Sequence, residues 1–540
     1  MTLYADQLLL NGRVVTMDDA RPVVSALALR SGRIVAAGDD SELAALRGPR
    51  TQVHDLHGST VLPGMVDSHL HWHRFSESLA AVNLFQVPSK EAALERVRER
   101  AAVLPAGRWI TGFGWVQDLW PDPRFPTAAD LDAVAPDHPV FLRARSGHAV
   151  WVNSLALRLA GVDASTVAPK GSEILHDEHG NPSGVLLEWD AMLLVERAIP
   201  LPTVDETADA MNEAQKAAWA LGMTGLHDFD DQECFAALQR LRERGQLGLR
   251  FLKNVNLKYL DSLLDLGVRW GYGDEWLRIG GLKLFADGAL GPHTALMIDP
   301  YEGEADNRGI VVVPKEAMAE AVLKATEAGL PATVHAIGDR AVHDVLDVYA
   351  LARAREAELG IPRSARRHRI EHVQLINPVD VGRLAELDLI ASMQPIHATS
   401  DFPVADRFWG PERVAYSYNP RLQLDRGVMV AFGSDAPYDV PGPLIGIHAA
   451  VTRRRADGSP GPDGWTPSAR VTLEQAIRAF TVAPAYIAGL EHSFGRLIPG
   501  YHADLIVVEG DYLSMQGDEL RTARILGTMV DGLWRYGEFG

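Results

Sequence analysis

From Glu206 onward, short apolar runs alternate with amphipathic stretches along the chain. The amphipathic stretches, such as K-E-A-M-A-E-A-V-L-K-A-T-E-A-G at 315–329, repeat their apolar positions with the period of a helix. The apolar runs have the length of buried strands and include M-T-G-L-H-D, L-R-F-L-K-N-V-N, I-G-G-L-K-L-F-A-D-G, P-A-T-V-H-A-I-G-D, R-H-R-I-E-H-V-Q, L-I-A-S-M-Q-P-I-H and V-M-V-A-F-G-S-D-A. With an earlier run from Val61 to Val66 they give eight predicted strands. This pattern predicts an α/β fold, the (β/α)8 TIM barrel, whose catalytic residues lie at the carboxyl ends of the strands.

The two ends of the chain have a different, β-rich pattern. Residues 1–58 contain short strand-like runs broken by turn pairs such as Asn11-Gly12. Residues 491–540 repeat this style in A-D-L-I-V-V-E-G and A-R-I-L-G-T-M-V-D-G-L-W-R-Y. We therefore predict a small β-sandwich domain built from both ends, with barrel strand one at 59–74 and the rest of the barrel at 206–490.

Residues 75–205 separate the first predicted barrel strand from the other seven. This stretch is rich in Pro, Gly and Trp and has no steady alternation of strands and helices. We interpret it as an insertion after barrel strand one that caps a site.

Composition limits the kinds of partner. The 540 residues are 47% hydrophobic and 23% charged, as in a globular protein, and 52 Lys and Arg against 71 Asp and Glu give a net charge of −19. That charge argues against nucleic acid or an anionic membrane and leaves a small-molecule substrate. No basic leader or apolar run of roughly 20 residues is visible, so we expect a cytoplasmic enzyme, with a homodimer left open.

Cys234 is the one cysteine, so the sequence excludes an internal disulfide and a thiolate metal site. Any metal must then bind to His and carboxylate side chains. The run G-M-V-D-S-H-L-H-W offers such ligands, because His69 and His71 are two residues apart and share one face of a strand. The alternative is a chance pair of histidines on a polar strand end.

Five of the predicted barrel strands have an ionisable residue at or near the carboxyl end. These residues are His69 and His71 on strand one, Lys283 on strand four, His335 on strand five, His372 on strand six and Asp435 after strand eight. A lone histidine on an apolar strand is most often a satisfied core residue. Four imidazoles and a carboxylate around one barrel mouth, however, would be buried without partners unless they bind metal.

Lys283 has two interpretations. An ammonium next to a dication costs energy, so the side chain could simply point outward between helices. Alternatively, a lysine with a lowered pKa reacts with CO₂, and the carbamate bridges two metal ions as an anion.

Seven motifs are spread over nearly the whole chain: V-D-S-H-L-H at 66–71, S-G-H-A-V-W-V-N-S at 146–154, G-L-K-L-F-A-D-G-A-L-G at 281–291, V-H-A-I-G-D-R-A at 334–341, I-E-H-V-Q at 370–374, G-S-D-A-P at 433–437 and G-Y-H-A-D-L-I-V at 500–507. Together they resemble the amidohydrolase superfamily, in the amidohydrolase-3 branch related to N-substituted formamide deformylases.

The resemblance implies a role for each ligand. It makes His69 and His71 ligands of one Zn²⁺, His335 and His372 ligands of a second, and carboxylated Lys283 the bridge, with a single zinc as the alternative. Asp435 would bind metal and act as general base. A hydroxide held by the metal would attack an amide-type C–N bond, and Asp435 would pass the proton to the leaving nitrogen.

Three further positions are candidate substrate-binding residues. His148 in S-G-H-A-V-W resembles a branch motif, and its alternative is a structural role. Trp115 could line a pocket or simply pack. Asp287 could orient a metal ligand or form a turn.

Other activities compete with amide hydrolysis. A deaminase of this superfamily usually has a glutamate three residues after the strand-five histidine, and here that position is Gly338. A hydrolase of cyclic amides or lactones is a second alternative. A non-catalytic metal-binding relative would be expected to lack the base, whereas Asp435 is present.

Overall fold

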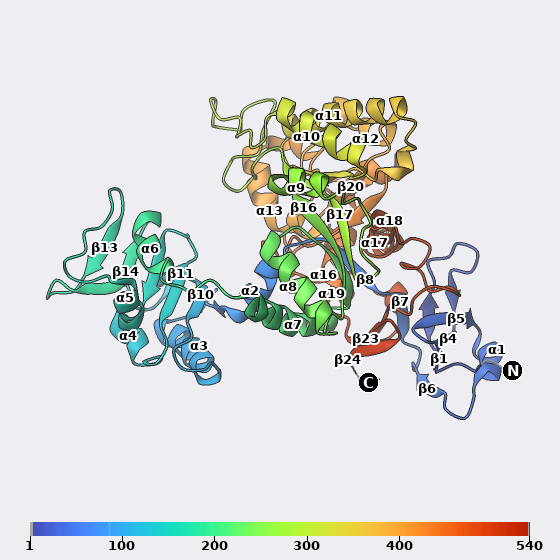
Figure 1. Ribbon diagram of the computed structural model, residues 1–540, viewed down its shortest axis with the longest axis horizontal. Coiled ribbons are helices and arrows are strands. Elements are labelled where there is room, and N and C mark those ends of the chain that lie inside the picture. Colours follow the sequence, from blue (N-terminus) through green and yellow to red (C-terminus); the bar gives the residue numbers. More distant parts are fainter. Residues whose placement is uncertain (1–3, 86, 538, 540) are drawn as a thin grey trace. The chain divides into compact units, whose positions relative to one another are not determined.

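The computed structural model describes residues 4–85, 87–537 and 539 (Figure 1). The chain divides into two compact units, one formed by Met1–Arg74 and Met211–Gly540 and the other by Phe75–Ala210. Among the described residues, no helix is both long enough and apolar enough to cross a membrane.

The first unit contains an eight-stranded sheet in which spatial order follows chain order and every neighbouring pair is parallel. Its strands are β8 (Met65–Leu70), β15 (Met223–Asp228), β16 (Arg250–Asn256), β17 (Leu277–Phe285), β18 (Ala332–Ala336), β19 (Arg369–His372), β20 (Ile390–Met393) and β21 (Val430–Phe432). This arrangement confirms the predicted TIM barrel.

Hydrogen bonds close the barrel between its first and last strands. The segment after β21 binds to β8, because the Asp435 amide donates to the His69 carbonyl at 2.7 Å and the Ser434 amide donates to the Asp67 carboxylate at 3.0 Å. The His71 amide in turn donates to the Ala436 carbonyl at 2.9 Å. The closure therefore brings a predicted ligand of strand eight next to the predicted ligands of strand one.

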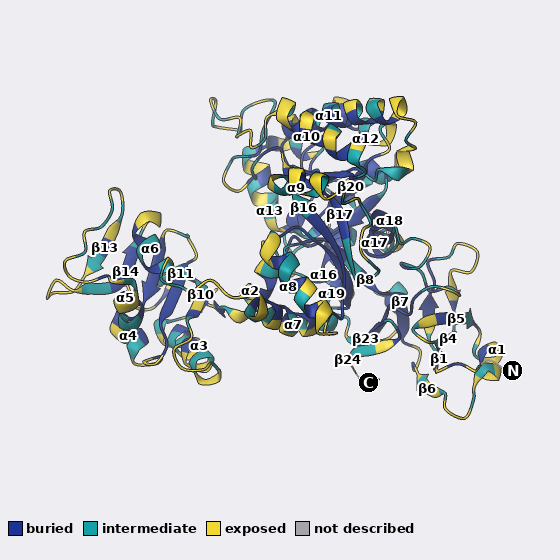
Figure 2. Cartoon of the chain, in the orientation of Figure 1, coloured by how far each residue is buried: buried dark blue, intermediate teal, exposed yellow. Residues whose placement is uncertain are grey.

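Helices follow the barrel strands, with apolar faces on the sheet and exposed residues outside, as α10 and α11 show in Figure 2. They are α7 (Val204–Ala220), α8 (Gln232–Glu243), α9 (Leu260–Asp265), α10 (Lys315–Ala328), α11 (Asp339–Glu358), α12 (Arg383–Glu386), α13 (Pro395–Phe408), α14 (Gly410–Val414), α15 (Pro420–Leu424), α16 (Pro443–Thr452), α17 (Leu473–Phe480) and α18 (Val482–Ile487).

The first unit has two further sheets, one made of N-terminal strands alone and one that combines strands from both ends of the chain. One has the order β5-β4-β1-β6 and the other β24-β23-β22-β7-β2-β3. Their bounds are β1 (Gln7–Leu10), β2 (Arg13–Val15), β3 (Val23–Val24), β4 (Ala26–Arg30), β5 (Arg33–Gly38), β6 (Gln52–Asp55), β7 (Thr60–Pro63), β22 (Leu505–Val508), β23 (Ile525–Val530) and β24 (Leu533–Gly537). Leu29, Val61 and Val507 share one buried cluster, so the two sheets have a common core.

Only Gly64 separates β7 of this β domain from β8 of the barrel. A Cβ at Gly64 would lie 2.3 Å from the Thr224 hydroxyl oxygen, so a side chain there would collide with strand β15. Glycine therefore allows one continuous path from the β domain into the strand that carries His69.

The second unit has a mixed sheet of its own, in the order β13-β14-β12-β11-β10-β9. Its strands are β9 (Val82–Asn83), β10 (Ile110–Trp115), β11 (Val140–Ala144), β12 (Ala149–Val152), β13 (Glu173–His176) and β14 (Pro182–Leu187), and its helices are α3 (Lys90–Val103), α4 (Ala128–Asp132), α5 (Ser154–Ala160) and α6 (Trp189–Glu196). Its buried residues, including Val97, Leu142 and Trp151, form a separate core.

Candidate metal centre

The six predicted ligands lie at one end of the barrel. His69, Lys283, His335 and His372 are on β8, β17, β18 and β19, whereas His71 and Asp435 directly follow β8 and β21. The imidazole centroids are close together, at 5.7 Å for His69 and His71, 4.8 Å for His69 and His372, and 4.5 Å for His335 and His372. The fold thus gathers residues that are more than 360 positions apart into one cluster, since the Ser434 amide bonds to Asp67 with a separation of 367.

Asp435 lies between the two histidines of β8. Its Oδ1 is 3.5 Å from His69 Nε2 and 3.4 Å from His71 Nε2, and ligand atoms of the three residues all lie within 4.8 Å of one another. Asp435 Oδ1 is buried and has no hydrogen-bond partner among the described residues. A buried carboxylate oxygen facing two imidazole nitrogens fits a divalent cation such as zinc.

Carboxylates determine which ring nitrogens of these histidines are free. His69 Nδ1 lies 2.5 Å from Glu371 Oε2, and His71 Nδ1 lies 2.9 Å from Asp230 Oδ1. Because an ionised carboxylate only accepts hydrogen bonds, each Nδ1 carries a proton, and in the neutral ring Nε2 keeps the lone pair. Both lone pairs are therefore available to a metal next to Asp435.

Burial and neighbouring charges shift the pKa values of three candidate ligands. Burial alone would lower the pKa of His71, but Asp230 and Asp435 raise it to about 9. Burial lowers the pKa of His69 well below its ordinary value. Burial would raise the pKa of Asp435, yet the nearby imidazoles, chiefly that of His69, hold it below its usual range.

His335 and His372 lie on the other side of the cluster. His335 Nε2 lies 2.9 Å from the Gly288 carbonyl, so it donates there and leaves Nδ1 free. His372 Nδ1 lies 2.8 Å from Gln394 Oε1, an acceptor, which leaves its Nε2 free. Each histidine thus keeps one nitrogen lone pair for a metal.

Lys283 is buried, at 1% exposure. Its Nζ has no hydrogen-bond partner among the described residues and lies 4.6 Å from the ring centroids of both Phe229 and Phe285. Burial lowers the pKa of Lys283 to about 8. A neutral amine is the form that reacts with CO₂, so the surroundings of Lys283 suit a carbamate.

Beneath the cluster lies a charged pair that the motifs alone did not assign. Glu371 Oε1 is 2.8 Å from Arg369 Nε, and both side chains are buried. Arg369 Nη1 lies 3.1 Å from His227 Nδ1, while Asp228 forms a 2.6 Å ion pair with Lys253. The candidate ligands therefore contact a second layer of paired charges.

Asp287 has a different role from the metal ligands in the structure. Its carboxylate accepts the backbone amides of Ile337, Gly338 and Leu296 at 2.8–3.0 Å. Burial raises the pKa of Asp287 to about 7, and its Oδ1 lies 3.5 Å from His335 Nε2. Asp287 thus holds the loop after β17 against the start of α11, beside His335.

His148 and Trp115 belong to the second unit. His148 is exposed, and its Nδ1 lies 2.9 Å from Glu188 Oε2. Trp115 is fully buried, donates from Nε1 to the Leu142 carbonyl at 2.8 Å and packs against Trp120 and Trp151. The tryptophan therefore belongs to the core of that unit, and substrate binding by either residue remains a prediction.

His397 is a member of the cluster that the sequence analysis missed. It lies on α13, and its Nε2 is 3.7 Å from Asp435 Oδ2. His372, His397 and Asp435 offer ligand atoms within 4.8 Å of one another. The signal was its position directly after the seventh strand, in M-Q-P-I-H, one helical turn beyond the strand end.

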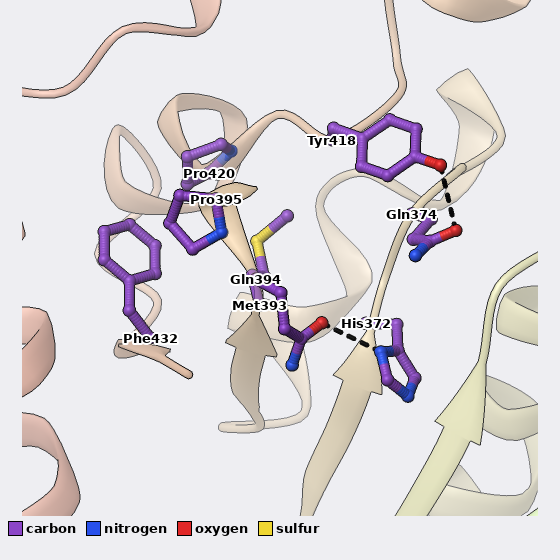
Figure 3. A pocket seen from close by; sticks show the side chains of 8 residues that line it. All are labelled: His372, Gln374, Met393, Gln394, Pro395, Tyr418, Pro420 and Phe432. Atoms are coloured by element: carbon purple, nitrogen blue, oxygen red, sulfur yellow. Dashed lines mark hydrogen bonds between the residues drawn. The ribbon is translucent and has the colours of Figure 1, made fainter. Parts of the chain in front are cut away.

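A small pocket opens beside His372 (Figure 3). It is lined by His372, Gln374, Met393, Gln394, Pro395, Tyr418, Pro420 and Phe432. Figure 3 shows two hydrogen bonds in its wall, from His372 Nδ1 to Gln394 and from the Tyr418 hydroxyl to Gln374. Hydrogen-bonded polar side chains therefore line the pocket next to His372, a candidate metal ligand.

Comparison with known proteins identifies the class that this barrel and its histidine cluster define. Residues 52–536 match the sequence model of the amidohydrolase family. The chain therefore belongs to the amidohydrolase family, and the predicted class, a hydrolytic enzyme acting on carbon–nitrogen bonds, is confirmed.

Individual relatives match the chain over nearly its full length. It is 31% identical to the putative amidohydrolase YtcJ of Bacillus subtilis, covering 96% of this chain and 97% of the relative. It is 29% identical to the N-substituted formamide deformylase of Arthrobacter pascens, covering 100% of both. The crystal structure of an uncharacterized metal-dependent hydrolase from Pyrococcus furiosus has a TM-score of 0.76 at 31% identity, covering 94% of this chain and 100% of that one.

Proposed function

We propose that this protein hydrolyses an amide-type C–N bond, in an N-substituted formamide or a related amide, with zinc as its metal. The observation that carries the proposal is the buried Asp435 Oδ1, which faces the free Nε2 atoms of His69 and His71. The formamide substrate class is supported by the similarity to the Arthrobacter deformylase.

Different residues of the chain would bind the metal and transfer the proton. When bound, zinc supplies a Lewis acid that polarises a carbonyl group and lowers the pKa of water. His69 and His71 would hold one ion, and His335 and His372 a second. Lys283, carboxylated on Nζ, would supply the anion between them. Asp435 would take the proton from the attacking water and give it to the leaving nitrogen.

The geometry disfavours the deaminase alternative. A Cβ at Gly338 would lie 2.0 Å from the Leu296 carbonyl oxygen. A glutamate three residues after His335, as a deaminase of this superfamily would need, therefore cannot be accommodated without moving the backbone. Amide hydrolysis requires no acid at that position.

The second unit is proposed as the cap that selects the substrate. Because β10 and β11 are inner strands of its sheet, deleting residues 105–150 would unfold it and could not test this role. His148→Ala is the better probe, since the side chain is exposed and, within the described residues, bonds to Glu188 alone. We expect a changed KM for some substrates and unchanged thermal stability.

The main test is a turnover screen of the zinc-loaded protein against N-substituted formamides, acetamides, cyclic ureas and lactones. We expect amine release from at least one formamide or amide, loss of that activity after chelation, and recovery when zinc is restored. Asp435→Asn serves as the inactive control. Turnover confined to lactones, or amine release that survives chelation, would contradict the proposal.

A further inference from the structure

His397 is the histidine of the cluster that lies on a helix rather than at a strand end. It is buried, and its two ring nitrogens have different neighbours. Nε2 lies 3.7 Å from Asp435 Oδ2, and Nδ1 lies 3.1 Å from Gln374 Nε2. The group next to Nδ1 determines where the proton of a neutral imidazole resides.

Gln374 presents an amide nitrogen to His397, and an amide nitrogen can only donate. His397 Nδ1 must therefore accept, which places the ring proton on Nε2. The amide is held in this orientation by Tyr418, whose hydroxyl lies 3.1 Å from Gln374 Oε1 (Figure 3). The acceptor end of the amide thus faces the tyrosine and the donor end faces the histidine.

The Tyr418 hydroxyl has a second neighbour, Asp401 Oδ2, at 2.9 Å. Burial raises the pKa of Asp401 above its ordinary value. The orientation at His397 follows from the amide itself, because Gln374 turns Oε1 toward Tyr418 and Nε2 toward His397 Nδ1.

This pattern is the reverse of that at the other histidines near Asp435. The Nδ1 atoms of His69, His71 and His372 face oxygens of Glu371, Asp230 and Gln394, so each of those rings keeps an Nε2 lone pair. His397 instead has a proton on the nitrogen that faces the site. A protonated ring nitrogen cannot bind a cation.

We propose that His397 is a positioning residue for Asp435 and not a metal ligand: its Nε2–H donates to Asp435 Oδ2 while Oδ1 stays directed at His69 and His71. The inference rests on the proposed function in that Asp435 handles the proton. The 3.7 Å separation exceeds a hydrogen bond, and such contacts commonly tighten when the reacting complex forms. The competing assignment is a metal site made by His372, His397 and Asp435, whose ligand atoms lie within 4.8 Å of one another.

Metal content separates the two assignments. Wild type, His397→Ala and His372→Ala are dialysed against zinc, and bound zinc per chain and its apparent affinity against a competing chelator are measured. We expect His397→Ala to bind as much zinc as wild type, and His372→Ala to bind less. Zinc loss in His397→Ala as large as in His372→Ala would overturn the proposal.

Kinetics test the donor role. His397→Ala should lower kcat by about 10- to 100-fold, the usual range for partners of metal-site residues, with little change in KM. His397→Asn, which keeps an N–H donor, should recover part of this loss. Equal loss in both variants, with zinc intact, would overturn the donor role.

Gln374→Glu provides a test that leaves His397 in place. A carboxylate at 374 accepts from His397 Nδ1 and moves the proton away from Nε2, so kcat should fall while zinc content is unchanged or rises. Unchanged kcat in this variant would contradict the proposal. If wild type cleaves no amide, the proposed function fails, whereas the zinc measurements still decide whether His397 is a ligand.

Discussion

Glu371 is expected to support both the barrel and the metal. Its two oxygens lie 2.8 Å from Arg369 Nε and 2.5 Å from His69 Nδ1, and both Glu371 and Arg369 are at most 1% exposed. Glu371→Gln keeps the shape but removes the charge, so the Arg369 guanidinium is left buried without its counter-charge. Breaking a buried pair in this way costs about 3–5 kcal/mol.

The same substitution weakens the hold on His69. A neutral amide is a poorer acceptor than a carboxylate, so it orients the imidazole less firmly. Loss of such a partner typically lowers metal affinity by about 10- to 100-fold. Glu371→Gln should therefore show lower stability of the metal-free barrel and weaker zinc binding at the same time.

Two measurements check this prediction. Because the chain has two units with separate cores, whole-chain unfolding is not a two-state measure, and hydrogen exchange of the β19 peptide in metal-free protein is the better readout. Zinc affinity is measured by chelator competition. Glu316→Gln, an exposed change on α10, is the matched control and should alter neither.

A double variant separates the two effects. Arg369→Met with Glu371→Gln removes both charges, so much of the lost stability should return, because a buried ion pair often contributes little over apolar residues of similar volume. Zinc affinity should stay low. If Glu371→Gln behaves like Glu316→Gln in both assays, the assigned role of Glu371 is wrong.

Three further predictions concern the base, the bridge and the acid response. Asp435→Asn should keep the fold and most of the zinc but lose several orders of magnitude in kcat; near wild-type turnover of the zinc-loaded variant would refute the base assignment. Lys283→Ala should lose zinc and activity, and acetate or propionate should restore part of both by occupying the vacated space; a purely structural lysine would show no such rescue. Burial raises the pKa of Glu356, but hydrogen bonds from His368 and Arg353 outweigh it and hold the pKa below the ordinary 4.5. The stability that Glu356 adds over Glu356→Gln should therefore be complete above pH 4.5 and vanish as pH falls through the lower folded pKa, measured by hydrogen exchange of the α11 peptide in both proteins; a difference that grows in acid would contradict this sign.

The barrel was predictable because its strands are continuous apolar runs, such as the one ending at His69, whose pattern depends on sequence alone. The grouping of the candidate ligands at one end of the barrel followed from the same rule. His397 did not, because it lies on a helix whose direction only the folded chain determines. Glu371 and Asp230 were missed because only the distance to an imidazole in the folded chain shows that a carboxylate bonds to it. The sequence does not give that distance, since His71 and Asp230 are 159 residues apart.

The mixed sheet of the second unit could not be derived for a related reason. Its strands β9 to β14 are short, and their pairing joins segments with irregular spacing, including a shift in register near Phe113. The sequence showed that the tryptophans at 115, 120 and 151 are large apolar residues, but it did not show where in the fold they lie. Their rings pack against one another in the core, and this depends on contacts between distant strands.

The join at Gly64 bears on the order in which a ribosome makes the molecule. Strand β7 pairs with β22, and the Thr60 hydroxyl donates to the Gly510 carbonyl 450 residues later. The strand carrying His69 is therefore anchored at its start by a segment that is translated 450 residues later, and barrel closure likewise waits for Ser434 and Asp435. A nascent chain that has already exposed His69 and His71 therefore has no completed site until Ser434 and Asp435 have been made and have bonded to β8.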